Sequence, residues 1–163
     1  MKLLQRIIVI VFISLACASC DQGTKSLADS YLPKNEMISY LNDTVRIGYV
    51  ENTGAFLGLG SSLSKEIRFF LFQAIAGIFL IALLGYAVIG SKLGLASITG
   101  VSLIFSGGAS NLYDRIVNDG AVIDFMNLGV GVLRTGVFNI ADVAIMAGGL
   151  LFIFSQSMHG NRE

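Results

Sequence analysis

Charged residues are scarce in this 163-residue chain, and the shortage excludes most classes of soluble protein. Lys, Arg, Asp and Glu make up 13% of the sequence, about half the share that is usual in a soluble domain, whereas hydrophobic residues make up 54%. The net charge is zero and no basic run occurs, which argues against a nucleic-acid partner. Together with a mean hydropathy of +0.74, this composition indicates an integral membrane protein.

Histidine, proline and cysteine are also rare, and tryptophan is absent. The one histidine, His159, and the lack of an HExxH motif exclude the usual zinc-hydrolase layouts. The one proline, Pro33, marks an ordinary loop. Cys17 and Cys20 have CxxC spacing, but no βαβ pattern surrounds them, so we expect helix-packing residues rather than a redox site. We expect neither a metal nor another cofactor.

Four apolar runs have the length of about 20 residues with which a helix crosses a bilayer. They cover approximately residues 7–28, 67–89, 93–113 and 136–157. The third run is rich in Gly, Ala and Ser, which is typical of a helix packed against other helices, and its Gly107 and Gly108 would permit close contact. We therefore predict a mainly α, integral-membrane fold, a four-transmembrane-helix bundle in which residues 1–163 form a single domain.

The N-terminus resembles a signal peptide, because residues 1–20 have a basic start, an apolar core and small residues before Cys20. Lipoprotein signals favour Leu three residues before the cysteine, and this chain has Cys17 there. Three more apolar runs follow. We therefore expect an uncleaved first span.

Basic residues flank the four runs on one side of the membrane. By the positive-inside rule this side, with both termini, is cytoplasmic. The two longer connections, residues 29–66 and 114–135, then lie outside. In the first of them, an alternating stretch at residues 44–50 predicts a short strand or hairpin, and residues 63–72 predict a short surface helix. The basic residues are Lys2, Arg6, Lys92 and Arg162.

Polar side chains gather at the outer ends of the predicted spans. Asp142 lies about one and a half helical turns into the fourth apolar run, and a carboxylate inside a span is a functional-site hypothesis by default. Asn139 is one helical turn away from it, and Asp124 lies in the loop before. The topology brings to the same face Asp21, Lys25, Asn52, Asn111, Asp114 and Arg115.

Asp124 and Asp142 can meet, because a loop leads directly into the fourth helix. Two neighbouring carboxylates in a poorly hydrated pocket cannot both ionise cheaply, so one retains its proton and the pair can activate water by general acid–base catalysis. The alternative is a buried ion pair between Asp142 and Arg115. Arg115 either clamps a substrate carbonyl or phosphate, or pairs with Asp114.

The spacing of Asp21 and Lys25, four residues apart, favours a structural tie at a helix end. Two other function classes stay open at this point. One is a small transporter or proton channel, in which Asp142 and Asp114 relay protons. Against it, the acids cluster at one surface, and Gln73 is the only polar candidate for a path to the inner side. The other is a structural membrane subunit whose polar cluster fixes helix packing.

Five short motifs, in order along the chain, are similar to those of bacterial lipoprotein signal peptidase (signal peptidase II). They are DQGTK at residues 21–25, NTGA at 52–55, NLYDR at 111–115, VIDF at 122–125 and FNIAD at 138–142. Each is weak alone, but five in order on a four-span frame are specific. The sequence departs from the family pattern at Ser110, where Gly is common, and at residues 56–57, where Ala-Phe is usual. These departures concern the shape of a substrate groove rather than the two acids.

The resemblance implies an aspartic endopeptidase of the bacterial inner membrane. It would remove the signal peptide from diacylglyceryl-modified prolipoproteins by cutting just before the lipidated cysteine, with Asp124 and Asp142 as the catalytic pair. An extracytoplasmic β-cradle would lie over the substrate, and globomycin-type cyclic peptides would inhibit. We expect a monomer. The residues implied to line or support the pocket are Asn52, Gly54, Asn111, Arg115, Asn139, Asp21, Lys25 and Asp114.

Overall fold

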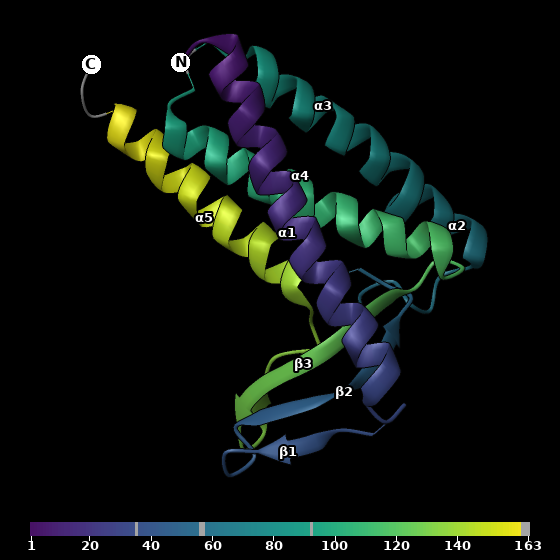
Figure 1. Cartoon of the computed structure of the whole chain (residues 1–163). Helices are drawn as coiled ribbons and strands as arrows, with labels where there is room; N and C mark the ends of the chain where they lie inside the picture. The colour runs from purple at the N-terminus through teal and green to yellow at the C-terminus, as the bar shows by residue number, and fades with distance from the viewer. Residues whose placement is uncertain (35, 56–57, 92, 161–163) are drawn as a thin grey trace.

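The computed structural model describes residues 1–34, 36–55, 58–91 and 93–160, and shows a helical bundle with a small sheet at one end (Figure 1). The helices are α1 (Leu3–Tyr31), α2 (Lys65–Phe69), α3 (Ala76–Ile89), α4 (Leu95–Val117) and α5 (Ile140–Gly160), and a π-helical segment, η2 (Phe70–Ile75), joins α2 to α3. The strands are β1 (Ile38–Tyr40), β2 (Val45–Asn52), β3 (Val122–Val130) and β4 (Leu133–Arg134). Lys92, Arg162 and residues 56–57, on which expectations rest, lie outside the described residues.

Within these residues, four helices are long and apolar enough to cross a membrane. They are Leu3–Tyr31, Lys65–Ile89, Leu95–Val117 and Ile140–Met158. Their outward faces expose large apolar side chains such as Phe12, Ile81 and Phe154, which a bilayer would cover. The N-terminus and the last turns of α5 lie at the same end of the bundle, away from the sheet (Figure 1). The predicted four-helix membrane fold with a small sheet is confirmed.

The second span begins inside the segment that was expected to form a surface helix. Ser64 caps it by accepting a hydrogen bond from the backbone N–H of Ile67 (3.4 Å). The helix then continues through η2 into α3, so the surface turn and the span are one continuous helix. Short π-helical segments often mark functional sites, and Phe72 in η2 lines an apolar groove.

The central helix is α4, as its small-residue composition predicts. In its most apolar 18-residue stretch 50% of the residues are buried, against 22% or less in the corresponding stretches of the other three spans. Glycines let α5 approach closely: a Cβ on Gly100 would lie 2.8 Å from the carbonyl oxygen of Gly148, and a Cβ on Gly107 would overlap that of Ala141. Gly108 admits Leu80 of α3 in the same way. The predicted close contact at Gly107 and Gly108 is confirmed.

Gly107→Ala is expected to destabilise the fold, because the added methyl group would overlap the Ala141 carbonyl and push α5 away. Overpacking of this kind costs about 1–3 kcal/mol. Gly85→Ala in α3 is the matched control, since a Cβ there meets nothing within 4 Å, and alanine favours the helix. Melting temperatures in detergent micelles measure the difference. Equal melting temperatures for the two variants would contradict close packing at Gly107.

A buried basic side chain ties the first two spans together. Arg6 of α1 donates hydrogen bonds to the carbonyl oxygens of Val88 (3.0 Å) and Gly90 (2.8 Å) at the end of α3. A cation at this position satisfies carbonyls that have no partner within the helix. Arg6 therefore contributes to helix packing as well as to the excess of basic residues on this side of the bundle.

The sheet joins the two longer connections into one layer. Its strand order is β1-β2-β3-β4, and all pairs are antiparallel. Strand β2 contains all of the predicted stretch 44–50 except Thr44, whereas β3 and β4 arise in the second connection, for which no strand is predicted. The register places Asn52 opposite Val122 and Val50 opposite Asp124. Asn52 and Asp124 are therefore diagonal neighbours on one face of the sheet.

Candidate active site

Two aspartates from different elements meet through one asparagine. Asp124 lies in β3, and Asp142 lies in the first turn of α5. The side-chain Nδ2 of Asn139 donates to Oδ1 of Asp124 (2.7 Å), while the backbone N–H of Asn139 donates to Oδ2 of Asp142 (3.2 Å). The sheet and the helix thus bring both carboxylates to one site.

Asn139 caps α5 and is not a residue within the helix. Its Oδ1 accepts a hydrogen bond from the backbone N–H of Asp142 (3.0 Å), and its own backbone N–H donates to the Asp142 carboxylate. These two bonds form a reciprocal capping box. Just before it, Phe138 still pairs with Met126 of the sheet. The expectation that Asp142 lies one and a half turns inside the span is therefore wrong. Asp142 lies at the helix end, where the helix dipole favours a negative charge.

The second donor to each carboxylate is a side-chain amide. Nδ2 of Asn111 donates to Oδ1 of Asp142 (3.0 Å), and Nδ2 of Asn52 donates to Oδ2 of Asp124 (2.9 Å). The Asn111 amide has a fixed orientation, because its Oδ1 accepts a hydrogen bond from Nζ of Lys25 (2.9 Å). An ammonium group can only donate, so the nitrogen of this amide must face Asp142.

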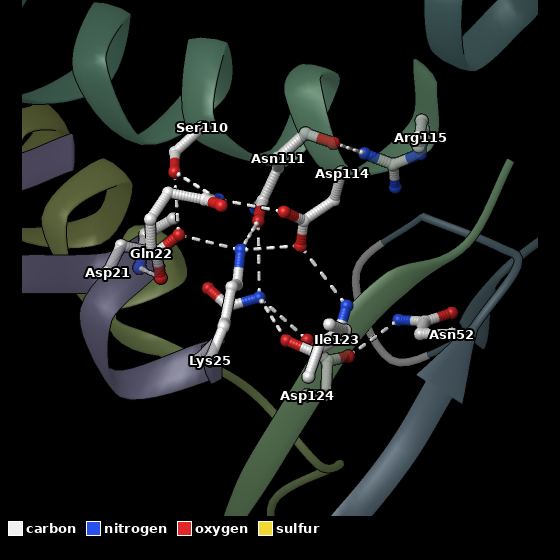
Figure 2. A network of polar contacts seen from close by, with 12 residues as sticks. Asp21, Gln22, Lys25, Asn52, Ser110, Asn111, Asp114, Arg115, Ile123 and Asp124 are labelled. Atoms are coloured by element: carbon white, nitrogen blue, oxygen red, sulfur yellow. Dashed lines mark hydrogen bonds and ion pairs between the residues drawn. The ribbon is translucent and has the colours of Figure 1, made fainter. Parts of the chain in front are cut away.

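Lys25 is buried at the centre of the polar network (Figure 2). Its Nζ lies 2.6 Å from Oδ2 of Asp21 and 2.8 Å from Oδ2 of Asp114. Each acid also accepts a backbone N–H, Asp21 from Ala141 (2.8 Å) and Asp114 from Ile123 (3.2 Å). Ala141 and Ile123 directly precede the two aspartates of the site. The ion-paired triad of Lys25, Asp21 and Asp114 therefore fixes the backbone on which both of them stand.

Two further members of the network were not among the predicted site residues. Oγ of Ser110 donates to Oδ2 of Asp21 (2.7 Å) and accepts from Nε2 of Gln22 (2.9 Å). Gln22 also donates to Oδ1 of Asp114 (2.7 Å). Both residues lie in or directly beside the recognised motifs, and that position is the signal that could have identified them.

The segment after β2 folds over the site. Oδ1 of Asn52 accepts the backbone N–H of Gly54 (2.9 Å), and Nδ2 of Asn52 also donates to the carbonyl of Ala55 (3.2 Å). A Cβ on Gly54 would lie 2.6 Å from the carbonyl oxygen of Leu59, so the chain can pass here only at a glycine.

Arg115 forms neither of the ion pairs considered from the sequence. Its guanidinium donates to the carbonyls of Gly54 (2.8 Å) and Asn111 (3.3 Å) and lies 5.7 Å from the ring centre of Phe72. In the part of the chain that is described, no salt bridge joins Arg115 to an acid. Arg115 therefore holds the loop over the site and keeps its charge available beside the groove.

An apolar groove of ≈ 530 Å³ adjoins Asp142. Asn111, Arg115 and Asp142 form its polar end. The remainder lies between α3, α4 and α5, and its wall includes the exposed side chains of Phe79 and Met146. Within the described residues, no cluster of three or more His, Cys, Asp or Glu side chains could hold a metal ion. The arrangement suits acid–base chemistry on a chain that carries an apolar group.

Comparison with known families matches this architecture. The family model described as "Signal peptidase (SPase) II" covers residues 13–158. The chain belongs to the signal peptidase II family. This membership confirms the resemblance drawn from the five motifs and makes the chain a protease. The transporter and the structural subunit, which the sequence left open, are not supported.

Known lipoprotein signal peptidases align with most of this chain. A lipoprotein signal peptidase of Treponema denticola is 34% identical over 134 residues, which cover 80% of this chain and 78% of the relative. A lipoprotein signal peptidase of Borreliella burgdorferi is 33% identical over 138 residues, which cover 82% of this chain and 80% of the relative. A solved bacterial membrane enzyme structure superimposes with a TM-score of 0.77 at 27% identity, covering 98% of this chain and 91% of the other.

Burial raises the pKa of Asp124 to about 7. The hydrogen bond from Asn52 acts in the opposite direction, and the neighbouring charge of Asp142 raises the pKa further. Two acids this closely coupled titrate as a pair. The pair in this signal peptidase therefore retains a proton up to about neutral pH.

The pH profile should show this shared proton. We expect kcat/KM to fall as the pH rises through about 7, because Asp124 then loses its proton. Asn52→Ala removes a donor that favours the ionised carboxylate, so the falling limb should move to higher pH. Ser39→Ala, an exposed residue of β1, is the control and should leave the profile unchanged. A limb that stays in place or moves to lower pH in Asn52→Ala would contradict Asp124 as the group that titrates there.

Proposed function

We propose that Asp124 and Asp142 are the catalytic pair with which this signal peptidase II removes signal peptides from prolipoproteins. The observation that carries the proposal is the position of Asn139, which donates to both carboxylates and so orients them. One carboxylate takes a proton from water as the water attacks the scissile carbonyl. The protonated partner polarises that carbonyl and then protonates the leaving amine. These steps need neither a metal nor another cofactor.

The surrounding residues hold the pair in position. Their shared task is to fix the side chains or the backbone of the two aspartates, and they are Asn52, Asn111, Asn139, Lys25, Asp21 and Asp114. Arg115 has a different place, because it lines the groove and donates a hydrogen bond to the carbonyl of Gly54. A guanidinium there can bind a carbonyl oxygen of the substrate.

The substrate is a prolipoprotein whose cysteine already bears a diacylglyceryl group, and the cut falls just N-terminal to that cysteine. A substrate anchored in this way stays in the membrane and arrives by lateral diffusion. The groove suits it, because exposed apolar side chains such as Phe79 and Met146 lead from the lipid-facing surface to Asp142. Acyl chains would occupy the apolar part while the scissile bond reaches the polar end.

The enzyme is a multi-pass protein, which we place in the bacterial inner membrane. Lys2 precedes the first span, and the N-terminus and the last turns of α5 lie at the end of the bundle opposite the sheet. The positive-inside rule then puts both termini in the cytoplasm and the catalytic pair at the extracytoplasmic face. We expect residues 1–163 to act as one domain and as a monomer, and globomycin-type cyclic peptides to inhibit by occupying the groove.

A comparison of two substrates tests this function. The purified chain is incubated in vesicles with a diacylglyceryl-modified prolipoprotein peptide and, separately, with the same peptide lacking the lipid. We expect cleavage directly before the cysteine of the lipidated peptide only, unaffected by a chelator and blocked by globomycin. Equal cleavage of both peptides, or cleavage at another bond, would overturn the proposal.

A further inference from the structure

Four strongly exposed apolar side chains gather on two neighbouring turns at the end of the sheet. Leu41, in the turn between β1 and β2, is 75% exposed, and Val130, Val132 and Leu133, in the hairpin of β3 and β4, are 75%, 101% and 82% exposed. Soluble surfaces rarely leave such side chains clustered in water. We call these four residues the apolar tip.

Polar contacts behind the apolar tip hold the two turns together. The guanidinium of Arg134 donates to the carbonyl of Asp43 (2.6 Å), and the N–H of Gly129 donates to the carbonyl of Thr44 (2.9 Å). The carboxylate of Asp43 is in turn paired with Arg46 (2.6 Å). The tip is therefore one projection rather than two independent loops.

The backbone of both turns directs apolar side chains outward. Val130 pairs with Leu133, which leaves Gly131 (φ 56°) and Val132 as a two-residue hairpin turn with Val132 at its apex. In the other turn, Leu41 has a φ of 50° and is followed by two more residues with positive φ. Left-handed conformations at non-glycine residues are unfavourable. The fold nevertheless adopts them and leaves Leu41 exposed.

The sheet that carries the apolar tip lies at one end of the bundle, next to the ends of the membrane-spanning helices. In Figure 1 the strands run across the axes of α1 and α5, so the sheet extends sideways from the end of the bundle. Only residues 134–139 separate Leu133 from Ile140, the first residue of α5. The first turns of α5 expose the apolar side chains of Val143 and Met146. The tip is thus placed at the level where the outer ends of the spans meet the leaflet.

We infer that the apolar tip inserts into the leaflet at the sheet end of the bundle. Leu41, Val130, Val132 and Leu133 enter the apolar boundary of the lipids. The charged side chains of Asp43 and Arg46 stay behind them among the headgroups, where they remain hydrated.

Insertion anchors the strands that carry half of the catalytic site. Strand β3 (Val122–Val130) carries Asp124 near one end and Val130 at the other, and β2 runs from Val45 to Asn52. At about 3.3 Å per residue, Val130 lies about 20 Å from Asp124. Lipid contact at one end of these strands would hold the other end, with Asn52 and Asp124, at a constant depth. This inference does not depend on which residues perform the chemistry.

Because the chain contains no tryptophan, the fluorescence of one introduced tryptophan reports on its position alone. Val132→Trp, in the full chain, is reconstituted in vesicles of phosphatidylcholine and phosphatidylglycerol, with lipids brominated near the ester end of the acyl chains as quenchers. We expect short-wavelength emission, loss of most of the fluorescence with brominated lipid, and little quenching by aqueous iodide. Leu133→Trp is a second reporter should Val132→Trp fail to fold.

Glu36→Trp is the matched control, because Glu36 is an exposed polar residue of the same layer away from the tip. Its tryptophan should emit at long wavelength and be quenched by iodide instead. The inference would be overturned if iodide quenched Val132→Trp as strongly as the control, or if brominated lipid quenched both positions equally. Short-wavelength emission of Val132→Trp without lipid quenching would also overturn it, because that result would indicate a second copy or another protein on the tip.

Discussion

Asp124→Asn and Asp142→Asn are each expected to lower the rate of prolipoprotein cleavage by about 1,000-fold or more. An amide can neither take a proton from water nor give one to the leaving amine, so each variant removes half of the acid–base pair. Asp124→Asn should still fold, because burial already disfavours the charged form of this side chain and raises its pKa to about 7. Mass spectrometry of a lipidated substrate after incubation measures the residual rate.

Asp119→Asn is the matched control for both variants. It is the same chemical change on the same side of the molecule, at an exposed side chain whose described partner is Lys65. We expect unchanged cleavage and an unchanged melting temperature. If Asp124→Asn or Asp142→Asn cleaves as fast as Asp119→Asn, the two aspartates are not the catalytic pair. Inhibition of the wild type by a chelator would indicate metal catalysis instead.

Lys25→Met is expected to lower the free energy of unfolding by about 3–5 kcal/mol, because removing one partner of a buried ion pair leaves the other charges uncompensated. Asp21 and Asp114 share the ammonium group of Lys25 and are themselves buried. The amide of Asn111 also loses the donor that fixes its orientation toward Asp142. Cleavage should therefore be lost together with stability, as thermal unfolding and the peptide assay would show.

Lys65→Met is the control, because it removes the same charge from an exposed ion pair instead of a buried one. Lys65 pairs with Asp119 at 2.6 Å, but both side chains are exposed, so this variant should melt like the wild type. Adding Asp21→Asn and Asp114→Asn to Lys25→Met should restore much of the melting temperature, since no uncompensated charge remains, but not cleavage. Equal melting temperatures for Lys25→Met and Lys65→Met would show that the buried triad does not stabilise the fold.

The four helices could be predicted because hydrophobicity over about 20 residues is a local property of the chain. Their ends could not be predicted as well. The fourth apolar run starts near residue 136, yet α5 starts at Ile140, because Asn139 and Asp142 cap the helix while Phe138 still pairs with the sheet. A cap and a strand pairing compete for the same residues, and only the folded chain shows which one prevails.

Strand β3 illustrates a second limit. Its sequence alternates weakly, and it becomes a strand because β2 provides a partner from a distant segment. Partners of charged residues are equally non-local. Arg115 and Asp114 are adjacent in the chain, yet Asp114 pairs with Lys25 of α1, and Arg115 donates to the carbonyl of Gly54. Sequence spacing gives distances within one helix but not between helices.

The sequence by itself determined that this protein spans a membrane four times, that its polar residues gather at one end, and that its motifs are those of signal peptidase II. These properties depend on composition, length and order along the chain. Only the tertiary structure decided that one buried lysine supports both aspartates through Asp21 and Asp114, and that Asn139 connects the sheet to the helix. These contacts depend on distances between segments that lie far apart in the sequence, and packing alone sets those distances.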